Sequence, residues 1–181
     1  MTNPTILGGR RAEIMLVEDN LGDEILAVRA FRTGTIENNF TVAGSGEEAW
    51  AMLKRVGRYG TQRLPDLILL DLNLPKMSGK NLLLLIKTDD DLRHIPVIVM
   101  TSSEATTDIK RSYDLYASAY IVKPMDIDAF KEVVTTIEQF FFIHALLPLP
   151  SAPPCDQQMP IMSHDQMSLF SDSEYRPSDL G

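Results

Sequence analysis

Four apolar runs in this sequence each end in a residue that can take part in phosphoryl or metal chemistry. These ends are an acid pair, a single acid, a hydroxyl and a lysine, in the order Glu18-Asp19, Asp71, Thr101 and Lys123. An aspartate at the end of a buried strand can act as a nucleophile toward phosphorus or as a ligand of a hard cation. Clustered carboxylates repel one another, so a cation and a lysine are their natural compensation. The four ends together predict a phosphoryl-accepting magnesium site.

The elements that must position these residues follow from the alternation of apolar runs with helix-like segments, which predicts a parallel sheet covered on both faces. The expected strands span 13–18, 40–43, 67–70, 96–100 and 119–122, and the expected helices span 22–33, 46–56, 78–88 with Ser78 as cap, 106–115 and 127–144. The predicted fold is therefore α/β, a flavodoxin-like doubly wound five-stranded parallel sheet of order 2-1-3-4-5 with five helices. In that order ligands bind outside the carboxyl ends of strands one and three, where Glu18, Asp19 and Asp71 would converge.

Length and composition set the outer limits of the prediction. The 181 residues suffice for one domain with an appendage. We expect a flexible N-terminus at 1–11, the domain at 12–147, and a proline-rich acidic tail at 148–181 that is disordered or an extended arm. The single cysteine, Cys155, cannot form an internal disulfide.

The charge and hydropathy of the chain exclude two classes of partner. The net charge is −8 and no cluster of lysine and arginine is present, which argues against a nucleic-acid surface. The sequence contains neither an apolar run long enough to span a bilayer nor the apolar core of a signal peptide. We therefore expect a cytoplasmic protein that binds neither nucleic acid nor a membrane.

The four strand ends and their spacing resemble the receiver domain of two-component response regulators, over roughly residues 12–144. The resemblance implies that Asp71 accepts a phosphoryl group from a histidine of a sensor kinase, in a signalling protein whose only chemistry is self-phosphorylation and autodephosphorylation. It also implies Mg²⁺ as cofactor, held by Asp19, Asp71 and the backbone carbonyl of Asn73, with Glu18 acting through a water molecule.

The resemblance assigns roles to further residues. Lys123 and Thr101 would contact the acylphosphate, with Thr101 and Tyr120 as the switch pair that changes the interaction surface. Asn73 and Ser103 occupy positions that tune dephosphorylation. A cis peptide bond is expected before Pro124.

A narrower resemblance is to the small response regulators of bacterial phytochromes, which implies a phytochrome-type kinase as partner. It is carried by the run from Asp71 to Lys76, the extended loop before the third strand and the apolar end of the fifth helix. That end has more apolar surface than one face of the sheet can bury, which favours a homodimer. The expected dimerisation residues are Phe140, Phe141, Phe142, Ile143, Leu146 and Leu147. The alternative is that 146–150 folds back on its own domain.

Three other classes of protein fit the residues less well. A phosphatase or mutase with an aspartyl nucleophile would need an acid where Asn73 stands. A flavin-binding module would need a phosphate-binding loop where Glu18-Asp19 stands, and the tail is too short and acidic for a DNA-binding domain. A relay intermediate and a constitutive protein-interaction platform, both on the receiver fold, remain open alternatives.

Overall fold

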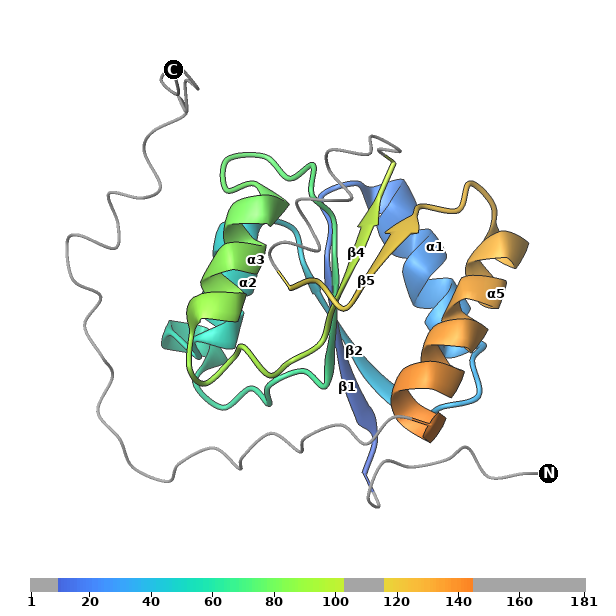
Figure 1. Ribbon diagram of the computed structural model, residues 1–181, viewed down its shortest axis with the longest axis horizontal. Coiled ribbons are helices and arrows are strands. Elements are labelled where there is room, and N and C mark those ends of the chain that lie inside the picture. The colour runs from blue at the N-terminus through green and yellow to red at the C-terminus, as the bar shows by residue number, and fades with distance from the viewer. Residues whose placement is uncertain (1–9, 103–115, 145–181) are drawn as a thin grey trace, which may run out of the picture.

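A computed structural model describes residues 10–102 and 116–144 as a five-stranded parallel sheet flanked by helices (Figure 1). The strand order is β2-β1-β3-β4-β5, and every neighbouring pair is parallel. This confirms the predicted sheet and its order. The strands are β1 (Ala12–Val17), β2 (Asn38–Ala43), β3 (Leu67–Leu70), β4 (Val97–Thr101) and β5 (Ala119–Val122).

Helices cover both faces of the sheet, as a parallel sheet with apolar strands requires. Figure 1 shows α1 and α5 on one face and α2 and α3 on the other. The helices are α1 (Leu21–Arg32), α2 (Gly46–Leu53), α3 (Gly79–Thr88) and α5 (Ile127–Ile137), with a short 3₁₀ turn, η1 (Gly57–Tyr59), before β3. The helix expected at 106–115 lies outside the described residues. In the part of the chain that is described, no helix is both long and apolar enough to cross a membrane.

Each of the four helices begins at a polar side chain that accepts hydrogen bonds from backbone N–H groups of the first turn. These caps are Asn20, Ser45, Ser78 and Asp126. The cap predicted at Ser78 is thus confirmed. Because the caps lie shortly after the strands, the helix N-termini gather at the carboxyl edge of the sheet, where they favour negative charge.

The C-terminal helix differs from the single helix expected over 127–144. After Ile137 it continues as a π-helix, η2 (Glu138–His144). The wider turn places two successive residues, Phe141 and Phe142, in the core, each 7% exposed, while Phe140 and Ile143 are 60% and 49% exposed. The expectation that all four form a surplus apolar surface was therefore wrong for Phe141 and Phe142. Leu146 and Leu147 lie outside the described residues.

A buried carboxylate, Glu138, joins η2 to the loop between α1 and β2. Its oxygens accept from the backbone N–H of Thr35 at 2.7 Å, the hydroxyl of Thr35 at 2.8 Å and the N–H of Ile36 at 3.4 Å. Burial of a carboxylate is costly unless hydrogen bonds replace its water. These bonds therefore fix the start of η2 against the sheet.

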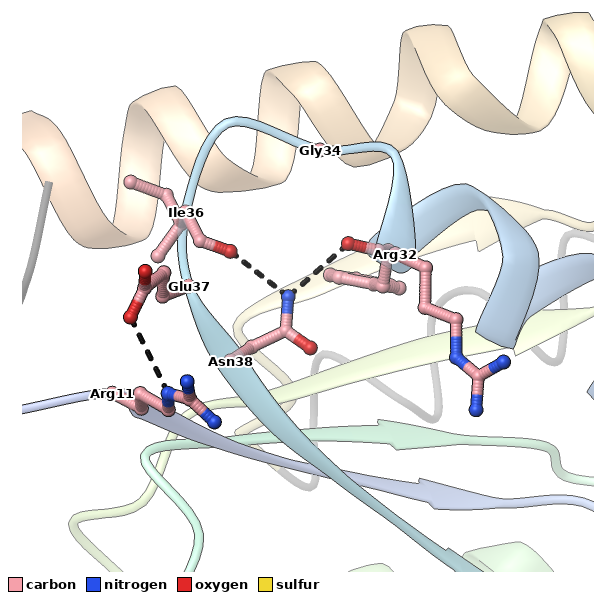
Figure 2. A pocket seen from close by; sticks show the side chains of 7 residues that line it. Arg11, Arg32, Gly34, Ile36, Glu37 and Asn38 are labelled. Atoms are coloured by element: carbon pink, nitrogen blue, oxygen red, sulfur yellow. Dashed lines mark hydrogen bonds and ion pairs between the residues drawn. The ribbon is translucent and has the colours of Figure 1, made fainter. Parts of the chain in front are cut away.

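A polar hollow of about 350 Å³ lies beside this loop, at the end of the sheet opposite to the predicted site (Figure 2). It is lined near the starts of β1 and β2 by Arg11, Glu37 and Asn38. The Nε atom of Arg11 is paired with Glu37 at 3.3 Å, and the amide of Asn38 donates to the carbonyl of Ile36. The hollow contains none of the predicted site residues.

The Glu138 contacts predict the effect of Glu138→Gln on stability. The amide group of glutamine would turn a donor toward N–H groups that need an acceptor, so the variant should lose about 1–3 kcal/mol of unfolding free energy. Urea denaturation measures this loss. Glu132→Gln removes an exposed acid from the same helix and should leave stability unchanged. Equal stability of Glu138→Gln and the wild type would contradict the anchoring role.

Candidate functional site

Asp71 follows directly after β3, whose four residues are fully buried. Its backbone N–H donates to the carbonyl of Val17 at 3.0 Å, which aligns it with the end of β1. The paired register Val17 with Leu70 then puts Glu18 and Asp71 side by side at the carboxyl edge. The parallel register, rather than any local motif, therefore brings the two acids together.

The start of α3 packs closely on the backbone that follows Asp71. The N–H of Gly79 donates to the carbonyl of Leu72 at 3.1 Å. A Cβ atom at position 79 would lie 2.7 Å from the Cα atom of Leu72, which is well inside contact distance. Only glycine allows this approach, so Gly79 helps to fix the position of Asp71.

Three carboxylates converge at this edge, as the sequence predicted. One oxygen from each of Glu18, Asp19 and Asp71 lies within 4.8 Å of the others, with Asp19 exposed and the other two buried. Such oxygens are the ligands that Mg²⁺ prefers, and an exposed side leaves room for its retained water. The residues present therefore fit a hard divalent cation. Burial raises the pKa of Glu18, although Lys123 opposes that effect.

Lys123 binds three carboxylates at once. Its Nζ atom lies 2.6 Å from Asp71 Oδ2, 2.7 Å from Glu18 Oε2 and 2.8 Å from Asp23 Oδ2. Burial acts to lower the pKa of Lys123, but the hydrogen bonds from Asp23, Asp71 and Glu18 raise it above its ordinary value. The ammonium group therefore stays charged and offsets the repulsion among the acids.

Asn73 connects the predicted acceptor, Asp71, to the predicted switch hydroxyl of Thr101. Its backbone N–H donates to Asp71 Oδ1 at 3.0 Å, and its side-chain amide donates to Thr101 Oγ1 at 3.2 Å. Thr101 is fully buried at the end of β4, and Tyr120 on β5 packs against the core beneath α2 and α3. Asn73 therefore links Asp71 to Thr101 through hydrogen bonds.

Two further predictions concern the peptide bond before Pro124 and the role of Ser103. The peptide bond before Pro124 is trans, so the expected cis bond was wrong. Trans is the ground state of such bonds by roughly 0.5–1 kcal/mol, and with it Lys123 already reaches its three carboxylates. Ser103 lies outside the described residues, so its tuning role stays a prediction.

Asp23 is a further residue of the site that was not predicted from the sequence. This acid lies in the first turn of α1, where an aspartate is expected merely because the helix dipole favours negative charge. Its place a few residues after the Glu18-Asp19 pair, at the start of the helix that follows β1, was the available signal. The structure instead pairs it with Lys123, 100 residues away in sequence.

The close packing at Gly79 predicts a stability loss in Gly79→Ala. The added methyl group must displace the backbone from the carbonyl of Asp71 to the Cα atom of Leu72, which should cost about 1–3 kcal/mol of unfolding free energy. Urea denaturation measures the change. Gly60→Ala is the control, because a Cβ there meets only ordinary contacts at 3.5 Å and beyond. A loss of the same size in both variants would show that packing at Leu72 is not its cause.

Comparisons with known proteins agree with this geometry. The response regulator receiver domain model matches residues 14–135. The chain is 38% identical over 135 residues to the response regulator Rcp1 of Synechocystis sp., covering 75% of this chain and 92% of Rcp1.

Solved structures extend the similarity to the fold. The phosphorylated cyanobacterial phytochrome response regulator RcpA matches with a TM-score of 0.73 at 40% identity, covering 77% of this chain and 99% of RcpA. The Mn²⁺-bound form of Rcp1 matches with a TM-score of 0.71 at 37% identity, covering 76% of this chain and 99% of that chain. With its sheet order, its acid cluster and its lysine, this chain belongs to the response regulator receiver domain family.

Proposed function

We propose that Asp71 accepts a phosphoryl group from a histidine of a sensor kinase. The proposal rests on the hydrogen bonds of the Asp71 carboxylate. One of its oxygens accepts from the ammonium of Lys123 and the other from the backbone N–H of Asn73. Two further acids of the cluster, Glu18 and Asp19, supply oxygen ligands beside it. This arrangement orients a carboxylate nucleophile next to a cation site.

In the proposed transfer, a carboxylate oxygen of Asp71 attacks phosphorus as the bond from phosphorus to the histidine nitrogen breaks. The leaving nitrogen keeps the electron pair of that bond, and the phosphoryl group becomes an acylphosphate on Asp71. Lys123 compensates the added charge. Asp19, Asp71 and the carbonyl of Asn73 would hold Mg²⁺, with Glu18 acting through water, and the bound cation would supply positive charge beside the phosphoryl oxygens.

Switching would start at Thr101. Its hydroxyl accepts from the Asn73 amide in this structure, and it can donate to a phosphoryl oxygen once Asp71 is loaded. Tyr120 lies on β5, which pairs with β4 and packs against the same side of the core as α2 and α3. A shift of Thr101 would therefore be transmitted to the surface of β4 and β5 through this strand pair.

The proposed kinase is of the phytochrome type. This is supported by the similarity to RcpA, which is described as a cyanobacterial phytochrome response regulator. Exposed apolar side chains flank the mouth of the site, with Leu21 at the start of α1 and Met125 after β5. The Asp23 to Lys123 ion pair holds these two segments together. We propose that the kinase surface around its histidine covers these two exposed side chains.

The proposed homodimer uses the exposed residues of η2, Phe140 and Ile143. Leu146 and Leu147 lie beyond the described residues and are part of the proposal on sequence grounds alone. Phe141 and Phe142 are left out because they fill the core of their own chain. Exposed apolar side chains so close together favour coverage by a second chain.

The acceptor role predicts one added phosphoryl group on the wild type after incubation with acetyl phosphate and Mg²⁺, and none on Asp71→Asn, which lacks the nucleophile. Intact-mass spectrometry measures the loading. Asp90→Asn removes an exposed acid that follows the C-terminal end of α3 and should load like the wild type. Chelation of Mg²⁺ should prevent loading. If the wild type binds Mg²⁺ but takes no phosphoryl group, the acceptor role is excluded. The alternative of a constitutive protein-interaction platform then remains.

The dimer proposal predicts that Phe140→Ser combined with Ile143→Ser halves the mass measured by light scattering after size-exclusion chromatography, since the apolar contact is lost. Loading of Asp71 should be retained. Leu84→Ser, which changes an exposed apolar residue on α3, should leave the mass unchanged. The proposed surface is excluded by a double variant that has the same mass as the wild type.

A further inference from the structure

The third partner of Lys123, Asp23, differs from the other two in its exposure. The side chains of Glu18 and Asp71 are 3% and 6% exposed, whereas that of Asp23 is 37% exposed. Asp23 comes from the first turn of α1, and Lys123 follows β5. Their ion pair thus bridges two elements at the rim of the site.

The hydrogen-bonding capacity of Lys123 is fully used in this arrangement. An ammonium group has three N–H donors, and three carboxylate oxygens lie between 2.6 and 2.8 Å from Nζ. A phosphoryl oxygen on Asp71 can therefore receive a hydrogen bond from Lys123 only if one carboxylate gives up its own.

Among the three carboxylates, Asp23 can give up its hydrogen bond to Lys123 at the smallest cost in free energy. Glu18 is buried and also accepts from the N–H of Asn20 at 3.1 Å, and Asp71 carries the phosphoryl group itself. Within the described residues Lys123 is the only side-chain partner of the Asp23 carboxylate. Because Asp23 faces solvent, water can replace the lysine there with little loss.

We propose that Asp23 is a positioning residue that holds Lys123 toward α1 and is exchanged for a phosphoryl oxygen when Asp71 is loaded. The inference rests on the proposed function and deepens it. Two consequences follow for loading. The exchange must break an ion pair, and the incoming anionic donor meets one more negative charge. Both slow the transfer, so Asp23 acts as a brake on phosphorylation.

The alternative is that Asp23 acts only as a helix-start acid that interacts with the dipole of α1. Glu24, the next residue, is also in the first turn of α1 and would serve the dipole equally. Within the described residues no side-chain partner of Glu24 is found. Glu24→Gln therefore removes the same charge from the same turn without touching Lys123, and is a matched control.

The test compares initial rates of loading from acetyl phosphate at saturating Mg²⁺, followed by intact mass. Asp23→Asn should load about two- to fivefold faster than the wild type, the range expected for loss of one half-exposed charge pair. Asp23→Glu can reform the ion pair and should stay within roughly twofold of the wild type. Glu24→Gln should load at the wild-type rate. Urea denaturation of each variant establishes that all are folded.

The outcomes separate this inference from the proposed function. If the wild type takes no phosphoryl group, the acceptor role itself fails. If the wild type loads and Asp23→Asn loads at the same rate or more slowly, Asp23 is not a brake and the inference is overturned. Equal acceleration in Asp23→Asn and Glu24→Gln also overturns it, because the effect would then be that of a remote charge rather than of the bond to Lys123.

Discussion

The ammonium group of Lys123 is the interaction on which the carboxyl edge of this sheet depends. Two buried acids, Glu18 and Asp71, lie beside each other there, and their carboxylates would repel each other without a positive neighbour. Lys123 lies within 2.7 Å of both. Removal of one partner from such a buried set leaves an uncompensated charge, which is why the lysine and the acids form one unit. The same unit holds both oxygens of Asp71 in place through Lys123 and the N–H of Asn73.

The backbone around this unit is equally constrained. Asp71 is fixed on one side by its bond to Val17 and on the other by the loop that returns to α3. Gly79 permits α3 to begin against that loop, and Asn73 uses its two N–H groups to join Asp71 to Thr101. Because these contacts are connected through Asn73, a new group on Asp71 would change several of them together. Movement of one hydrogen bond at Asn73 changes the contacts of a buried hydroxyl at the end of β4.

The far end of the molecule shows how a local change in helix geometry redistributes apolar surface. A regular helix over 127–144 would turn only one face to the sheet, and the run from Phe140 to Ile143 would exceed it. The π-helix η2 brings two of those residues into the core and leaves two outside. The buried carboxylate of Glu138 fixes this turn to the α1 to β2 loop. The positions of the exposed residues Phe140 and Ile143 on the surface are thereby fixed.

The sequence by itself determined the sheet, its order and the central acids of the site. Parallel strands buried on both faces read as continuous apolar runs, so their ends are visible in the sequence, and the family's chain order fixes where those ends meet. Glu18, Asp71, Thr101 and Lys123 could be placed for this reason. The tertiary structure alone decided the role of Asp23, the trans bond before Pro124 and the burial of Phe141 and Phe142. The role of Asp23 depends on a contact 100 residues away in sequence, and the burial of Phe141 and Phe142 accompanies a change of helix type, and neither leaves a periodic signal in the residues nearby.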